Sequence, residues 1–264
     1  MRLRPSCILA YLSCALLTTS LRAQLVNEVD LALVLAVDVS GSMDPEEQEL
    51  QRKGFVEAFR SDLVHDAIKA GMLGRIAVSY MEWAGSRRQT LVVPWTIIES
   101  PEGATEFAER LAGAPTQRAP RTSISGAIEF SLRLFDGMKI EPLRRVIDIS
   151  GDGVNNEGGS VVEARDEAVA RGVTINGLPL MLKRARGYWD VENLDHYFRD
   201  CVIGGSGAFM VPVRERQQLA QAIKTKIVRE IAGVGASPKV VPIQADAPTN
   251  CGTGGTRDWD RMRN

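Results

Sequence analysis

The sequence is poor in residues on which several common functions depend. It has only two histidines, His65 and His196, and neither belongs to a spaced metal-ligand motif, which argues against a histidine-dependent hydrolase. Lysine and arginine number 32 against 33 acidic residues and form no basic run, so a nucleic-acid partner is not expected. The sequence also lacks a glycine-rich phosphate loop that ends in Lys-Ser or Lys-Thr.

Long apolar runs are also scarce, and the one that resembles a targeting signal lies at the start of the chain. Arg2 and Arg4 precede the apolar residues 8–17, and Ala23 is a candidate for the last residue before cleavage. This pattern predicts a secretory signal peptide over residues 1–23, whose apolar part is too short for a transmembrane helix. No later stretch is long and apolar enough to span a bilayer. The predicted signal peptide leads us to expect an exported protein, either periplasmic or secreted.

Cysteine is rare, and two of the four cysteines lie within the predicted signal peptide. The remaining pair, Cys201 and Cys251, either forms a disulfide or stays as two free thiols. We favour the disulfide because Cys251 lies in a tail that has little else to anchor it. A closed loop of about 50 residues would stabilise the fold by roughly 4 kcal/mol in the chain-entropy model.

The most informative stretch of the sequence begins at residue 31. Residues 31–37 are all apolar and end at Asp38, which is typical of a strand buried on both faces of a parallel sheet. Residues 44–47 (Asp-Pro-Glu-Glu) then predict a helix start with a capping box. Asp38, Ser40 and Ser42 therefore lie between the carboxyl end of a strand and the amino end of a helix, where open α/β sheets bind ligands.

These three residues all offer hard oxygen donors, and their alternate spacing lets them converge on one point if the turn curls. Gly41 removes a Cβ where the backbone must approach closely. Such a donor set suits Mg²⁺, which takes few protein ligands and keeps several waters. An ordinary capped turn is the alternative interpretation, because Ser and Asp are common turn residues, and this stretch alone does not decide between the two.

Predicted strands and helices alternate along the rest of the chain. Further strands are expected at residues 75–82, 90–95, 145–150, 173–180 and 209–213. Helices are expected at residues 44–60, before Gly71, and at residues 101–112, 124–135, 161–171 and 214–231. The second and third strands are joined by a short link, which favours a hairpin, and Pro94 marks an edge position. The fold class predicted is α/β: a doubly wound, mostly parallel, Rossmann-like sheet with one antiparallel edge strand.

We expect a single domain over residues 30–232. Residues 183–207 interrupt the alternation with aromatic residues and Cys201, so they are expected to form an insertion, with a helix over residues 190–199. Residues 233–264 are rich in proline, glycine and asparagine and are expected to form an irregular C-terminal tail.

Oxygen donors stand at two more predicted turns. Thr122 and Ser123 follow Pro120 at the start of a helix, where capping is the commonest role of such residues. Asp152 follows the strand at residues 145–150 and lies between two glycines, which is also compatible with a simple glycine-rich turn.

Three separated motifs together resemble the von Willebrand factor A (VWFA) domain with its metal-ion-dependent adhesion site (MIDAS). They are Asp38-Val-Ser-Gly-Ser42, Thr122-Ser-Ile-Ser-Gly-Ala127 and Ser150-Gly-Asp152-Gly153. The resemblance covers about residues 30–232. Short sequence segments, such as residues 93–95 and 201–205, look like those of a group of exported bacterial members of this superfamily.

This resemblance implies a site for a divalent cation, most often Mg²⁺, with Mn²⁺ or Ca²⁺ as alternatives. Ser40 and Ser42 would bind the metal directly, Thr122 directly or through water, and Asp38 and Asp152 mostly through waters. One coordination position would stay open for an Asp or Glu carboxylate of a partner. Gly151 stands where many members carry Thr or Ser, which removes a helper hydroxyl.

Four further residues are candidates for the rim of the site. They are Glu82, Arg121, Asn155 and Asn156. For each of them a solvated loop side chain is the alternative interpretation.

The resemblance implies an exported, metal-dependent protein-binding module, not an enzyme, whose ligand is a protein with an exposed Asp or Glu. One alternative is a metal-dependent hydrolase, which the lack of a positioned histidine disfavours. An aspartyl phosphatase would usually carry Asp at the position of Ser40. The other alternative is a structural exported domain with a vestigial metal site. The sequence leaves the oligomeric state open.

Overall fold

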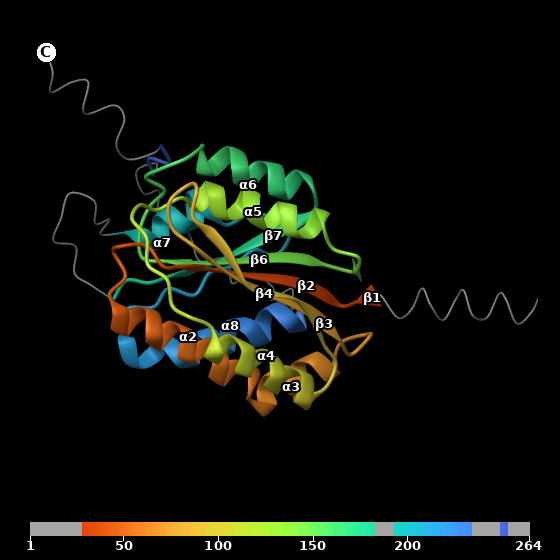
Figure 1. The fold of residues 1–264 in the computed structure, drawn as a ribbon. Coiled ribbons are helices and arrows are strands. Elements are labelled where there is room, and N and C mark those ends of the chain that lie inside the picture. Colours follow the sequence, from red (N-terminus) through yellow and green to blue (C-terminus); the bar gives the residue numbers. More distant parts are fainter. Residues whose placement is uncertain (1–27, 183–192, 234–248, 253–264) are drawn as a thin grey trace, which may run out of the picture.

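The computed structural model describes residues 28–182, 193–233 and 249–252 (Figure 1). The predicted signal peptide, residues 183–192 of the predicted insertion and most of the predicted tail lie outside the described residues. Within the described part, no helix is long and apolar enough to cross a membrane.

The centre of the fold is a five-stranded sheet in the order β4-β3-β2-β6-β7. Four strands run parallel to one another: β2 (Leu31–Asp38), β3 (Ile76–Trp83), β6 (Arg145–Gly151) and β7 (Val173–Pro179). The edge strand β4 (Gln89–Ile98) runs antiparallel to β3. The predicted sheet, mostly parallel with one antiparallel edge strand, is therefore confirmed.

The central position of β2 explains its apolar sequence. Every residue of β2 is buried, because strands flank it on both sides and helices cover both faces of the sheet (Figure 1). Successive side chains point to opposite faces. Leu31, Leu33 and Leu35 pack into one hydrophobic core, whereas Ala32 and Val34 pack into the other.

Helices form the two outer layers of the domain. The layer drawn below the sheet in Figure 1 consists of α2 (Pro45–Phe59), α3 (Asp62–Lys69), α4 (Pro101–Gly113) and α8 (Leu219–Ala232). The layer drawn above it contains α5 (Ile124–Asp136) and α6 (Val161–Ala170). Because α2 and α5 are on opposite faces, the loops that precede them approach the edge of β2 from both sides.

The start of α2 has the capping box that its sequence predicts. Asp44 accepts a hydrogen bond from the backbone nitrogen of Glu47 at 2.8 Å, and the Glu47 carboxylate accepts one from the nitrogen of Asp44 at 3.0 Å. Two of the backbone donors that a helix start leaves unpaired are thereby satisfied. This fixes where the loop after β2 ends.

Pro94 lies where the pairing of β3 with β4 shifts register, between the pairs Val78–Thr96 and Tyr80–Val93. Proline has no N–H group to donate to the ladder, so an irregularity on an edge strand accommodates it. The predicted edge position of this segment is confirmed.

Residues 209–213 do not form the predicted last strand. This segment forms isolated bridges, Met210 with Gly177 of β7 and Val213 with Leu180, the residue after β7. Pro179 lacks the N–H group that would donate to the carbonyl oxygen of Val211 in a continuous ladder, and the Asn176 side chain accepts the hydrogen bond of the Phe209 nitrogen. The segment therefore lies beside β7 without extending the sheet as a regular strand.

Two helix predictions need smaller corrections. The last helix begins later than residue 214, with a 3₁₀ turn at Arg216–Gln218 before α8. In the predicted insertion, helical structure runs through α7 (Leu194–Tyr197) and then a wider π-type turn at Phe198–Val202. A small two-stranded sheet of β1 (Glu28–Val29) and β5 (Glu141–Pro142) was not predicted.

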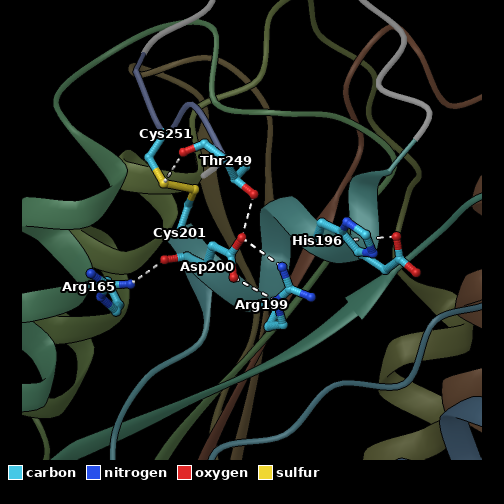
Figure 2. Close-up of polar contacts among 8 residues, drawn as sticks. Arg165, His196, Arg199, Asp200, Cys201, Thr249 and Cys251 are labelled. Atoms are coloured by element: carbon cyan, nitrogen blue, oxygen red, sulfur yellow. Dashed lines mark hydrogen bonds and ion pairs between the residues drawn. A yellow bond between two sulfur atoms is a disulfide. The ribbon is translucent and has the colours of Figure 1, made fainter. Parts of the chain in front are cut away.

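A disulfide joins Cys201 to Cys251, as predicted, with the two Cα atoms 5.5 Å apart. Figure 2 shows the bond together with the contact of Thr249, whose hydroxyl donates to the Asp200 carboxylate. Cys201 is fully buried and Cys251 packs against the same hydrophobic core. The described tail residues 249–252 are thus held against the turn that follows α7.

Candidate metal centre

The candidate site is built where two neighbouring parallel strands end. In the register of the sheet, Val37 of β2 lies beside Ser150 of β6, so Asp38 and Asp152 follow at the same edge. The loop after β2 leads directly into the capped start of α2. This edge is where an open α/β sheet exposes its loops to a ligand.

Four of the five predicted metal ligands form one continuous chain of hydrogen bonds. Oδ1 of Asp38 accepts from the backbone nitrogen of Ser40 at 2.7 Å. The hydroxyl oxygens of Ser40 and Ser42 are 2.8 Å apart, and the Ser42 hydroxyl donates to Oδ1 of Asp152 at 2.5 Å. Asp38 and Ser40 are buried, Asp152 is half-buried and Ser42 is exposed, so the chain runs from the interior to the surface.

The fifth predicted ligand, Thr122, lies against the loop that carries Asp152. A Cβ added to Gly153 would be 3.8 Å from Oγ1 of Thr122. The backbone nitrogen of Thr122 donates to Oδ1 of Asn156 at 2.9 Å, and its carbonyl oxygen accepts from the Asn156 nitrogen at 2.9 Å. The structure therefore brings all five predicted ligands to one edge of the sheet.

Ser123, not Thr122, caps α5. The Ser123 hydroxyl accepts from the backbone nitrogen of Gly126 at 3.2 Å. The capping role that the sequence leaves open between these two residues falls to Ser123, and the Thr122 hydroxyl is left available to the site.

The donor set fits a hard divalent cation. The side chain of Asp38 is fully buried, and within the described residues its Oδ2 atom has no hydrogen-bond partner. The backbone of Gly151 lies so close that an added Cβ would be 2.9 Å from this oxygen. Two carboxylates and three hydroxyls are oxygen ligands of the kind that Mg²⁺, Mn²⁺ and Ca²⁺ prefer.

Hydroxyl groups are essential to this candidate site. Nowhere in residues 28–182, 193–233 and 249–252 do three or more His, Cys, Asp or Glu side chains gather in a way that suits a metal ion. The site must therefore depend on Ser40, Ser42 and Thr122 besides the two aspartates.

Electrostatics at Asp38 also favours a cation. Burial raises the pKa of its carboxyl group to about 8, with a further contribution from the nearby charge of Asp152, while hydrogen bonds with Ser40 oppose the shift. A bound divalent ion would offset the repulsion between the two carboxylates.

Glu82 is not a rim residue. Glu82 pairs with Val37, the residue before Asp38 in β2. Because successive side chains alternate between the faces of a sheet, the Glu82 side chain points to the face opposite that of Asp38. It is buried and forms an ion pair with Arg52 of α2. Burial raises the pKa of the Glu82 carboxyl group, and the charge of Arg52 opposes that shift. The pair connects α2 to β3 beneath the site.

The two asparagines of the predicted rim hold neighbouring loops together. Asn155 is buried, and its Oδ1 accepts from the backbone nitrogen of Ser125 at 3.0 Å. Its own backbone nitrogen donates to the hydroxyl of Tyr197 at 3.2 Å, which connects the loop to α7. Asn156 is half-buried and holds Thr122, as described above. Asn155 is thus interior, and Asn156 lies at the border of the site.

Arg121 is exposed beside Thr122, with a backbone φ of 72°. In the described part of the chain it is the one residue other than glycine with positive φ. Such a conformation costs about 1 kcal/mol or more and persists where surrounding contacts fix it.

Sequence reasoning missed two residues that touch the site loops. Arg118 donates through Nη2 to the carbonyl oxygen of Gly41 at 2.5 Å. Tyr197 reaches the Asn155 loop from α7. The sequence carries no local signal for either contact, because each joins segments that are more than 40 residues apart and meet only in the folded chain.

Solved structures with the same architecture define the class of fold. A von Willebrand factor type A structure from Catenulispora acidiphila aligns with a TM-score of 0.52 and 13% identity, over 77% of this chain and 43% of that one. The pilus adhesin SpaC from Lactobacillus rhamnosus GG aligns with a TM-score of 0.57 and 11% identity, over 77% of this chain and 30% of that one. The fold of this chain is that of a von Willebrand factor A domain, as the sequence motifs indicate.

A third similar structure contains a metal. Proximal thread matrix protein 1 from the mussel byssus, with a zinc-occupied MIDAS motif, aligns with a TM-score of 0.52 and 14% identity over 75% of this chain. The alignment covers 46% of that protein. The present chain thus spans less than half the length of these three proteins.

The chain belongs to the family described as "Protein of unknown function (DUF1194)", which it matches over residues 28–235. A comparison with curated proteins gave no match.

Proposed function

We propose that this chain is an exported, metal-dependent protein-binding module that captures a partner's carboxylate through a divalent cation. The hydrogen-bonded chain Asp38–Ser40–Ser42–Asp152 carries the proposal, because it gathers oxygen donors from two loops at one surface edge. A bound cation would supply a positively charged coordination position that attracts an outside anion.

The chain's own residues have separate tasks in this proposal. Ser40, Ser42 and Thr122 offer neutral hydroxyl oxygens to the cation. Asp38 orients the loop by accepting the Ser40 nitrogen, and Asp152 orients the Ser42 hydroxyl. With few direct anionic ligands, the ion keeps a net positive charge with which to bind a carboxylate.

Binding is favoured over catalysis because of where the described histidines lie. Nε2 of His65 is 2.8 Å from the carbonyl oxygen of Phe59, so it belongs to the junction of α2 and α3. His196 lies within α7 (Figure 2), and its backbone nitrogen donates to Oδ1 of Asp195 at 3.1 Å. Both histidines lie in short helices, α3 and α7, and not in the loops that carry the five candidate ligands, whereas a hydrolase would need a histidine acid or base positioned at the reacting group.

Export is part of the same proposal. The disulfide between Cys201 and Cys251 suits an oxidising compartment such as the periplasm or the cell exterior. Similarity to the fold of a pilus adhesin is in keeping with a surface or periplasmic role.

The proposal is tested by measuring carboxylate capture with and without metal. A fluorescent peptide with one central Asp is titrated with the mature chain by anisotropy, in Mg²⁺ or Mn²⁺ and then in chelator, beside its Asn counterpart. We expect binding of the Asp peptide to need the cation and to be lost in Ser40→Ala/Ser42→Ala. The Ser61→Ala variant, altered at the distant start of α3, is the matched control. Equal binding of both peptides, or binding that survives chelation, would contradict the proposal.

A further inference from the structure

Four exposed arginines gather on the loops around the candidate site. Arg87 and Arg88 lie in the hairpin between β3 and β4, and Arg118 and Arg121 lie in the segment that leads into α5. We call this set the basic rim. None of its members is among the five candidate metal ligands.

The segment with Arg118 is joined directly to the metal loop. Nη2 of Arg118 donates to the carbonyl oxygen of Gly41 at 2.5 Å. Ala119 forms an isolated parallel bridge with Ser40, and its nitrogen donates to the carbonyl oxygen of Val39 at 3.3 Å. Because residues 118–119 run alongside residues 39–41, the Arg118 guanidinium lies at the border of the site.

The hairpin is joined to the same segment. The backbone nitrogen of Ser123 donates to the carbonyl oxygen of Ala84 at 2.7 Å. A Cβ added to Gly85 would lie 3.1 Å from the carbonyl oxygen of Pro120 and 3.2 Å from Cβ of Arg121. The four arginines are therefore on two loops in contact with each other, and one of these loops also contacts the metal loop.

The charge of the basic rim is largely uncompensated. The ion pairs of the described residues involve other cations, and none of the four rim arginines takes part in one. The acidic side chain bonded to these loops is Glu157, which accepts from the nitrogen of Ser86 at 2.7 Å. Since the whole chain has 32 basic and 33 acidic residues, a general excess of cations does not explain this cluster.

We propose that the partner segment is acidic, with one carboxylate bound to the metal and neighbouring carboxylates bound by the basic rim. This inference rests on the proposed function for the metal-bound carboxylate. The planar guanidinium group of arginine matches the geometry of a carboxylate and can bind it through two hydrogen bonds. A positive rim also speeds the encounter with a negatively charged segment.

The experiment compares two peptides on the full mature chain with saturating Mn²⁺. One peptide carries a single central Asp in a Gly/Ser background, and the other adds two acidic residues on each side. Affinity is measured by anisotropy for wild type, for Arg87→Gln/Arg88→Gln/Arg121→Gln, and for Arg60→Gln as matched control. Arg60 is an exposed arginine at the far end of α2. Mn²⁺ affinity is measured by calorimetry for every variant.

We expect wild type to prefer the acidic peptide by about tenfold, since each exposed ion pair contributes only a few-fold to affinity. The triple variant should reduce this preference to about twofold or less, while Arg60→Gln should keep it. The preference should also fall steeply with added salt.

The experiment distinguishes a failure of the basic-rim inference from a failure of the proposed function. Metal-dependent binding of both peptides with equal affinity would overturn the basic-rim inference and leave the proposed function intact. Lack of any metal-dependent binding would overturn the proposed function itself. If inorganic polyphosphate displaced the acidic peptide and bound more tightly than it, an acidic protein segment would be the wrong partner class.

Discussion

The Ser42 hydroxyl donates a hydrogen bond of 2.5 Å to Oδ1 of Asp152, a residue 110 positions further along the chain. This contact joins the loop after β2 to the loop after β6 at the edge where both strands end. The site is thus formed between loops that only the parallel sheet brings together, and its geometry depends on the fold as a whole.

Gly151 should be needed for the position of Asp38. A Cβ at residue 151 would lie 2.9 Å from Oδ2 and 3.3 Å from Cβ of Asp38, which is too close without a shift of the buried carboxylate. We therefore expect Gly151→Ala to lower metal affinity by about tenfold or more, as displaced site residues commonly do. Calorimetric titration with Mn²⁺ measures the change.

Gly113→Ala is the control for that substitution, because a Cβ at Gly113 meets no atom within 4 Å. It should leave metal affinity unchanged. If Gly151→Ala bound Mn²⁺ as tightly as wild type, Asp38 would not be the anchor of the site.

Asn155 should hold the loops of the site in place. Its side chain accepts from the Ser125 nitrogen and donates to the carbonyl oxygen of Gly159 at 3.0 Å. Asn155→Ala leaves the buried Ser125 nitrogen without this partner, so we expect a loss of about 1–3 kcal/mol of stability in urea unfolding. The neighbouring contact of Asn156 with Thr122 should loosen as well, and metal affinity should fall.

Asn193→Ala is the matched control, since the Asn193 side chain makes no capping hydrogen bond at the start of α7. Its stability and metal affinity should stay close to wild type. Equal effects of the two substitutions would show that Asn155 has no special role at the site.

A buried ionic cluster between β6 and α8 should make stability depend on pH. Nζ of Lys226 is 2.5 Å from Oδ1 of Asp148 and also pairs with Glu230. Burial, together with the charge of Asp148, raises the pKa of Glu230 from 4.5 to about 8, and Lys226 opposes the shift. The folded state therefore holds a proton on this cluster that the unfolded state releases at lower pH.

The direction in which stability changes with pH follows from that difference in proton binding between the folded and unfolded states. The contribution of Glu230 is fully present below pH 4.5 and is lost progressively as pH rises toward about 8. Its slope is at most about 1.4 kcal/mol per pH unit. Urea unfolding across this range should show a shallower decline for Glu230→Gln than for wild type. Identical slopes for the two proteins would contradict this assignment.

The disulfide should contribute substantially to stability. Cys201 and Cys251 are separated by 50 residues, and a loop of this length is expected to contribute roughly 4 kcal/mol in the chain-entropy model. Cys251→Ser should lower the midpoint of urea unfolding accordingly. Thr249→Ala, which removes only the hydrogen bond to Asp200, should have a much smaller effect. A similar midpoint for wild type with and without reductant would contradict the prediction.

Local sequence motifs were sufficient to locate the candidate ligands that stand next to strand ends. Asp38 and Asp152 could be predicted because a buried apolar run followed by an acidic residue indicates a strand end, and parallel strands end at one edge. Ser40 and Ser42 follow from the same loop.

Predictions that depended on contacts across the fold were less successful. Glu82 was misplaced because alternation along β3 directs it to Arg52 on the other face of the sheet. Residues 209–213 look like a strand, but Pro179 and the Asn176 side chain interrupt the ladder beside β7. The contact of Arg118 with Gly41 could not be predicted from the sequence, because it depends on the bridge between Ala119 and Ser40 in the folded chain.

The most direct test of a metal site at this edge is a calorimetric titration of the chelator-stripped mature chain with Mg²⁺ and Mn²⁺. Wild type is compared with Asp152→Asn and with Asp136→Asn, whose carboxylate lies on the surface and pairs with Arg171. We expect saturable one-site binding in wild type and Asp136→Asn, and affinity reduced by about 10- to 100-fold in Asp152→Asn. Absence of saturable binding in wild type, or equal affinity in all three proteins, would contradict the account.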